Sequence, residues 1–208
     1  GIDRASIRNR TGDIRVIAVG GEAAEVGLSG VLPSAAGALT LTNGATLATV
    51  ADDSSAGGKI TVSAGPIAVQ GGSTIITSAE SSGDAGSVTV RGGELTIAGL
   101  GTTSLTGILS TTVSSGNAGT LQVATLGQTS IVNSAVISSR TFGSGDAGAV
   151  MLSAGSLNID GGGFPGGACV FSPACLANGV TNARLTGIFG QTYPLSSGDA
   201  GSVVVTVA

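Results

Sequence analysis

Histidine and tryptophan are absent from the 208 residues, and the aromatic content is limited to four Phe and one Tyr. A conventional globular domain of this length uses more aromatic side chains to fill its core. The absence of His also removes the commonest metal ligand and the usual base for a Ser or Cys nucleophile. The composition therefore disfavours a conventional globule, a metal centre and an enzyme.

Charged residues are few, with 8 basic and 12 acidic side chains and a formal net charge of −4. No basic patch with interleaved aromatic residues occurs, so we expect no nucleic-acid partner, and we expect no cofactor. Gly, Ser and Thr interrupt every apolar stretch before it reaches the length of a membrane-spanning helix. The chain starts at Gly1 without Met, as expected of a processed product or a fragment.

Glycine is abundant, at 37 residues, and most other residues are Val, Ile, Leu, Ala, Ser and Thr. β-branched residues favour pleated, half-buried surfaces, and Gly favours the turns between strands. No segment combines a sustained helical period of apolar residues with good helix formers. The sequence therefore predicts an all-β fold.

One short segment recurs along the chain and is the strongest signal in the sequence. The copies are SSAGGKITV (54–62, degenerate), SSGDAGSVTV (81–90), SSGNAGTLQV (114–123), GSGDAGAVML (143–152) and SSGDAGSVVV (196–205). Their last glycines are Gly58, Gly86, Gly119, Gly148 and Gly201. The intervals between these glycines are 28, 33, 29 and 53 residues. A repeat of this length predicts stacked coils that share one continuous core.

Three short apolar runs follow each marker segment, separated by Gly-rich corners. In the period after Gly86 they are Val88 to Val90, Leu95 to Ile97, and Ile108 with Leu109. Such runs are too short for an ordinary sandwich but suit the three faces of a triangular coil. We therefore predict a right-handed parallel β-helix, a β-solenoid of about six three-sided coils. It covers residues 30–208 and follows an irregular entry segment at 1–29, within which 12–19 is expected to form a strand.

The corner sequence G-[DN]-A-G carries an acidic or amide residue at equivalent positions of four coils. These residues are Asp84, Asn117, Asp146 and Asp199. We interpret them as turn-closing residues that bond their own backbone, beside glycines that permit positive φ. A column of oxygen ligands for Ca²⁺ is the alternative, which Asn117 disfavours because it lowers the charge.

The longest interval contains a loop insertion at 161–183, which holds both cysteines. Cys169 and Cys175 are separated by five residues, with Pro173 between them. A local disulfide, which implies an oxidising compartment, is the preferred interpretation; a pair of free thiols is the alternative. Without His or a second pair of cysteines, the pattern of a zinc site is absent.

The sequence offers little support for two other functions of a β-helix. Polysaccharide-cleaving β-helices need clustered carboxylates, whereas the acidic residues away from the corners are scattered: Asp52, Asp53, Glu80, Glu94 and Asp160. Thr-rich stretches at 40–50 and 101–113 could form a flat ice-binding face, but exposed β-strands commonly contain Thr. We therefore expect a protein without catalytic residues.

The combination of SSGDAGSVTV, RGGELTIAG and the I/L-rich run before SSGNAG resembles the repeats of filamentous-haemagglutinin-like exoproteins. These are the large secreted proteins of two-partner secretion systems, and the resemblance covers about residues 30–208. It implies a right-handed β-helix that is exported to the cell surface and acts in adhesion, matrix or fibre formation. It implies no catalytic residues.

The expected function is an extracellular structural or adhesive rod. The strand at 202–208 follows a corner directly and is expected to leave an unpaired edge that can accept another chain. Copies could therefore stack head to tail into a filament, with cell-surface or matrix glycans as further partners. A carbohydrate-binding or polysaccharide-cleaving β-helix is the alternative.

Overall fold

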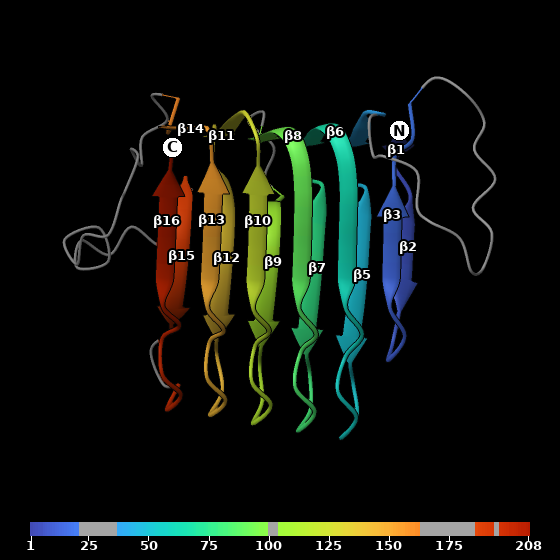
Figure 1. The fold of residues 1–208 in the computed structure, drawn as a ribbon. Coiled ribbons are helices and arrows are strands. Elements are labelled where there is room, and N and C mark those ends of the chain that lie inside the picture. The colour runs from blue at the N-terminus through green and yellow to red at the C-terminus, as the bar shows by residue number, and fades with distance from the viewer. Residues whose placement is uncertain (21–36, 100–103, 163–185, 194–195) are drawn as a thin grey trace.

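The computed structural model describes residues 1–20, 37–99, 104–162, 186–193 and 196–208, and these residues form strands and turns without a helix. Every strand pair is parallel, in one ten-stranded and one six-stranded sheet. The chain therefore adopts the predicted all-β fold of stacked coils (Figure 1).

Each coil contributes strands to three faces, which we name front, top and back as they lie in Figure 1. The front face contains β3 (Ile14–Ile17), the first part of β6 (Ile60–Gln70) and of β8 (Val88–Ala98), β10 (Leu121–Thr125), β13 (Val150–Ala154) and β16 (Val203–Val207). The top face contains β1 (Ile2–Asp3), β4 (Leu39–Thr42), the second parts of β6 and β8, β11 (Gln128–Val132) and β14 (Ser156–Asp160). The back face contains β2 (Ser6–Asn9), β5 (Thr46–Ala51), β7 (Thr74–Ala79), β9 (Thr106–Thr112), β12 (Ala135–Thr141) and β15 (Gly187–Thr192).

The coils wind in a right-handed sense. From the blue N-terminal end to the red C-terminal end, the chain rises along the front strands, crosses the top and descends along the back strands (Figure 1). The described strands of the back face form a six-stranded sheet, one strand per coil, which agrees with the prediction of about six coils. The repeated corner segments connect each back strand to the next front strand along the lower edge of the stack.

Equivalent residues of successive coils stand side by side, as the repeat predicts. In the front sheet Val88 pairs with Ile60 on one side and with Leu121 on the other. In the back sheet Ile108 pairs with Ile75 and with Ile137. Parallel neighbours in a sheet lie about 4.8 Å apart, so each apolar side chain stacks on its counterpart in the next coil.

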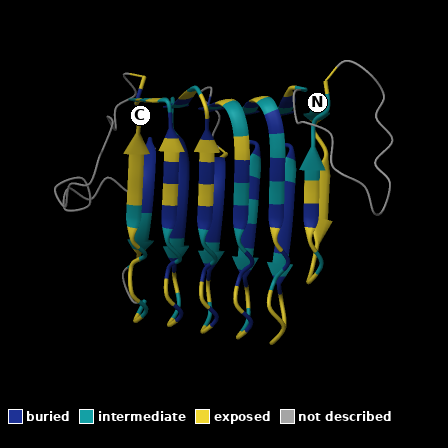
Figure 2. Cartoon of the chain, viewed as in Figure 1, coloured by how far each residue is buried: buried dark blue, intermediate teal, exposed yellow. Residues whose placement is uncertain are grey.

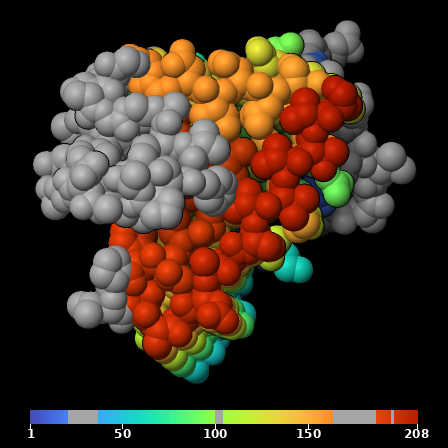
Figure 3. Space-filling view, turned by 90° about the vertical axis from the view of Figure 1, so that its left-hand side faces the viewer, coloured from blue at the N-terminus to red at the C-terminus, as the bar shows by residue number. Residues whose placement is uncertain are grey.

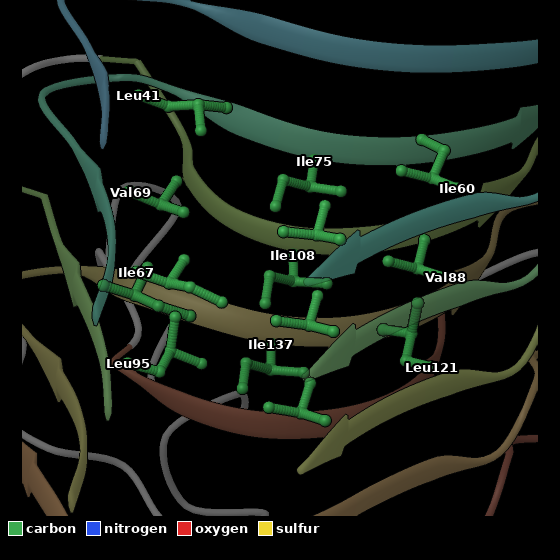
Figure 4. Packing of buried hydrophobic residues seen from close by; sticks show 14 of the residues in the cluster. Leu41, Ile60, Ile67, Val69, Ile75, Val88, Leu95, Ile108, Leu121 and Ile137 are labelled. Atoms are coloured by element: carbon green, nitrogen blue, oxygen red, sulfur yellow. The ribbon is translucent and has the colours of Figure 1, made fainter. Parts of the chain in front are cut away.

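Inward side chains of the three faces meet along the axis and form one core (Figure 4). Ile75, Ile108 and Ile137 project from the back strands toward Ile60, Val88 and Leu121 on the front strands, and all six are fully buried. Along the front parts of β6, β8, β10 and β13, buried residues alternate with intermediate or exposed ones (Figure 2). This alternation follows from the period of two in an extended chain with one face in the core.

The first residues are more regular than their sequence indicates. Within the segment 1–29, β1 pairs with β4, β2 pairs with β5, and β3 pairs with β6. The expected strand at 12–19 corresponds to β3. This regularity is not visible in the sequence because the corner between β2 and β3 is short and lacks the repeated segment. Coil stacking requires only that the apolar residues Ile2, Ile7 and Ile14 lie in register with the next coil. The predicted loop insertion at 161–183 follows β14, and its residues 163–183 lie outside the described ranges.

Candidate binding and assembly surfaces

The corner residues Asp84, Asn117, Asp146 and Asp199 form a column of hydrogen bonds between coils. The backbone N–H of Asn117 donates to Asp84 Oδ1 at 2.7 Å, and that of Asp146 donates to Asn117 Oδ1 at 2.9 Å. The N–H of Asp199 donates to Asp146 Oδ1 at 2.7 Å. The side chains of Asp84, Asn117 and Asp146 thus each bond the next coil, whereas the sequence suggested a bond to their own turn. Asn can replace Asp in this column because only an acceptor oxygen is needed.

A second set of bonds runs through the same corners in the opposite direction. The Ala residue after each Asp or Asn donates its N–H to the backbone oxygen of the next coil's Asp or Asn. The pairs are Ala85 with Asn117, Ala118 with Asp146, and Ala147 with Asp199, each at 2.8 Å. Corner-to-corner bonding therefore fixes the register of neighbouring coils at their lower edge.

The corner glycines serve close packing and not positive φ. Gly58, Gly86, Gly119, Gly148 and Gly201 all lack positive φ; that conformation occurs at the turn between the top and back faces, for example at Asn43 and Gly44. A Cβ built on any of these five glycines would overlap the backbone oxygen of the glycine in the preceding coil. The expectation of a left-handed corner is therefore wrong, and the physical reason for Gly here is the stacking distance.

Buried hydroxyl groups connect the back strands to these corners, a feature that the sequence analysis missed. Thr49 Oγ1 donates to the Gly58 backbone oxygen at 2.7 Å. Ser110 Oγ accepts the Gly119 N–H at 2.6 Å, and Ser139 Oγ accepts the Gly148 N–H at 2.7 Å. All three hydroxyl residues are fully buried. The signal was available, because each hydroxyl residue lies nine residues before its corner glycine.

Several described threonines of the Thr-rich stretches face the core and not the surface. Thr49, Thr106 and Thr112 are fully buried at inward positions of the back strands. Thr112 donates to the Gly116 backbone oxygen in the corner that follows it. These hydroxyl groups satisfy backbone atoms inside the coil, so they are unavailable to a surface ligand.

The carboxylates outside the column are not gathered at one site. Asp52 forms an ion pair with Arg10 at 2.9 Å, and Asp53 Oδ1 accepts the Ser55 N–H at 2.7 Å within the same corner. Asp160 Oδ1 accepts the Gly162 N–H at 2.9 Å at the end of the top face. Among the described residues, no three His, Cys, Asp or Glu side chains come close enough together to hold a metal ion. The calcium interpretation of the column stays a prediction, as does the disulfide, since Cys169 and Cys175 lie outside the described residues.

One aromatic pair is brought together on the back face. The rings of Phe142 and Tyr193 stack with centroids 4.1 Å apart and planes inclined by 20°. Beside them, Arg140 Nε donates to Ser138 Oγ at 3.0 Å. Burial lowers the pKa of Arg140, and the nearby Tyr193 opposes this effect. No constant spacing to the corner glycines links Phe142 with Tyr193, so the sequence held no signal for this pair.

A shallow groove crosses the outer surface of four front strands, β8, β10, β13 and β16. Its outward lining residues form two rows that run from coil to coil. One row contains Thr89, Gln122, Met151 and Val204, and the other contains Arg91, Ala124, Ser153 and Thr206. In the second row the small side chains of Ala124 and Ser153 lie between Arg91 and Thr206 and form the floor of the groove. Arg91 is the charged residue of this lining, and the lining contains no carboxylate.

The two ends of the stack expose residues that are buried in every inner coil. At the C-terminal end (Figure 3), Val205 is 42% exposed, whereas its partner Leu152 in the preceding coil is 2% exposed. At the other end, Ile7 is 43% exposed although its partner Leu47 is fully buried. Both ends therefore present apolar side chains together with a strand edge.

Comparison with known proteins gives no relative. No protein-family model, curated protein or solved structure matches the chain. A search of the described residues for a helix long and apolar enough to cross a membrane finds none.

Proposed function

We propose that this chain is an extracellular structural and adhesive rod, without catalytic activity, that assembles head to tail into a filament or surface fibre. The observation that carries the proposal is the match between the two ends of the stack. Following the pairing from coil to coil, Val203 occupies the position of Ile14, and Val205 that of Val16. A second copy could therefore set its β3 beside β16 in the register that every inner pair of front strands uses.

The other two faces support the same register. Ile159 on β14 is equivalent to Ile2 on β1, and Ile188 on β15 is equivalent to Ile7 on β2. Apolar side chains would thus meet apolar side chains on all three faces. Full burial of an exposed apolar side chain contributes about 1.5–3 kcal/mol, so covering the half-exposed Ile7 and Val205 would contribute part of this to association.

The charges of the two end coils are complementary as well. The described part of the first coil, residues 1–20, carries Arg4, Arg8, Arg10 and Arg15 against two acidic residues, Asp3 and Asp13. The described part of the last coil carries Asp160 and Asp199 and no basic residue. The proposed register also places Asp3 beside Asp160, which is a contact between like charges. Arg4, the next residue after Asp3, carries the opposite charge beside this contact. Opposite net charge at the two ends favours a head-to-tail contact over a contact between like ends.

The resemblance to filamentous-haemagglutinin-like exoproteins supports secretion and a role at the cell surface. The preferred disulfide between Cys169 and Cys175 fits an oxidising compartment. Among β-helix functions, adhesion is favoured over glycan cleavage because the described carboxylates are spread over corners and the top face, away from the groove.

Electron microscopy of the purified 208-residue chain tests the assembly. We expect fibres that lengthen with protein concentration and shorten in high salt, because charge attraction between end coils is screened. Residues that follow β16 in a longer polypeptide would occupy the same edge. Particles of single-chain length at every concentration and salt level would refute the filament. The edge of β16 would then be the place where further coils of the same polypeptide pair.

A further inference from the structure

Charge is distributed unevenly over the surface of the rod. The chain has a net charge of −4, yet the outward positions of the six front strands carry two Arg residues and no acidic residue. These outward positions are, from the first coil to the last, Arg15 and Ile17, Thr61 and Ser63, Thr89 and Arg91, Gln122 and Ala124, Met151 and Ser153, and Val204 and Thr206. The described acidic residues lie instead at corners, on the top face and at the end of β7.

The groove lies within this front face and runs along the axis of the rod. Ala124 and Ser153 form its floor because their side chains are small, and Gln122 and Met151 stand beside them as the higher side. A ligand that fits must be extended and narrow, since the groove crosses four coils at about 4.8 Å each.

The chemistry of the lining indicates the kind of ligand. Arg91 is exposed, and the structure records no ion pair between it and a described carboxylate, so its guanidinium can bind an anionic group. Gln122, Ser153 and Thr206 offer hydrogen-bonding groups, and Met151 and Val204 offer apolar surface. Hydroxyl groups, apolar C–H faces and a carboxylate occur together in the uronic acid units of acidic polysaccharides.

We propose that this groove binds an acidic polysaccharide chain parallel to the rod axis, with a carboxylate of the chain at Arg91. The proposal rests on the adhesive part of the proposed function and names its partner class. Arg is suited to a carboxylate because its planar guanidinium can make two parallel hydrogen bonds. A groove with Arg and neutral polar residues binds such a chain without cleaving it, since acid–base groups are absent from the lining.

Binding of oligogalacturonate to the 208-residue chain, measured by calorimetry at low salt, tests the proposal. Arg91→Gln should weaken binding about tenfold or more, because a hydrogen bond to a charged group is lost. Lys59→Gln is the control, since Lys59 is an exposed cation at a corner outside the groove and away from the proposed junction, and its affinity should equal that of the unchanged chain. Ala124→Phe should abolish binding by filling the floor. Both groove positions are exposed, and unchanged circular dichroism would confirm that the variants fold.

Three results would overturn the proposal: no binding of oligogalacturonate, equal affinities for Arg91→Gln and Lys59→Gln, or equal affinity for a neutral cello-oligosaccharide. Binding of polyglutamate with the same dependence on Arg91 would also overturn it, in favour of an acidic peptide. Microscopy of the same variants separates this proposal from the filament. Fibres without glycan binding would refute the groove alone, and glycan binding by single chains would refute the filament alone.

Discussion

At the scale of single residues, stacking determines which side chain is allowed at a corner. Asp146 acts on the following coil through one acceptor oxygen, and Gly119 leaves room for the backbone oxygen of Gly86. Neither role depends on the residue's own turn. Substitutions at corners should therefore change the contact between coils. The loss in free energy of unfolding should depend on whether the substitution removes a hydrogen-bond acceptor or adds an atom that overlaps the neighbouring coil.

A methyl group at a corner glycine should be costly. In Gly119→Ala the new Cβ overlaps the Gly86 backbone oxygen, so the free energy of unfolding should fall by about 1–3 kcal/mol. Gly93→Ala is the control, because its Cβ would lie 3.4 Å from the nearest atom, the Gly65 oxygen. Denaturant unfolding of both variants checks this. Equal stabilities would mean that the corners are less closely stacked than described.

The corner column should distinguish an acceptor oxygen from a charge. Asp146→Ala removes the acceptor for the Asp199 N–H and should reduce stability by about 1 kcal/mol. Asp146→Asn keeps an acceptor, as Asn117 does, and should be nearly neutral. Thermal unfolding with Ca²⁺ and with a chelator completes the test. A Ca²⁺-dependent stabilisation that Asp146→Asn abolishes would instead support the calcium interpretation.

At the scale of strands and turns, each element is stable because its neighbours on both sides repeat it. Ile108 is enclosed by Ile75 and Ile137 within the back sheet and by the front strands across the core. Ile108→Ala should therefore lower the free energy of unfolding by about 2–5 kcal/mol in the same denaturant measurement. Leu126→Ala is the control, because Leu126 is 90% exposed and its truncation should be nearly neutral.

The contact between the first two top-face strands should depend on pH. Asp3 Oδ1 accepts hydrogen bonds from Asn43 Nδ2 at 2.7 Å and from Thr42 Oγ1 at 3.1 Å. These bonds lower the pKa of the exposed Asp3 carboxyl below its usual value. A lowered pKa means that the contact contributes fully above the usual pKa and is lost as pH falls through the lowered one. Asn43→Gly, which suits the positive φ of this turn, should raise the Asp3 pKa in an NMR titration. An unchanged pKa would contradict the assignment.

The sequence predicted the elements well because each inward position is repeated. The runs Val88 to Val90, Leu95 to Ile97, and Ile108 with Leu109 all lie in strands of the expected faces. The atomic role of the corners was not predictable, since G-D-A-G is compatible both with a turn that bonds itself and with one that bonds its neighbour. The groove was not predictable either, because Arg91 and Ser153 lie 62 residues apart in the sequence and come into one row, on either side of Ala124, only through stacking.

At the scale of the whole molecule, an inner coil has a neighbour on both sides, whereas the described end coils have one. The described ends of the rod therefore have unpaired strand edges, whereas the strands along its sides are paired. Its ends present apolar residues in matching register, and its front face presents a groove without acidic groups. Assembly and adhesion would then use separate surfaces, so a filament could bind glycans along its length.

The register of the junction is the most direct test of this account. Chains with Arg15→Cys are mixed with chains carrying Val204→Cys, oxidised, and digested for mass spectrometry. The account predicts a disulfide between positions 15 and 204, because these outward residues become neighbours when β3 of one copy pairs with β16 of another. Ile17→Cys, two residues further along β3, is the control and should cross-link poorly to position 204. Equal cross-linking of positions 15 and 17, or none of either, would contradict the head-to-tail junction.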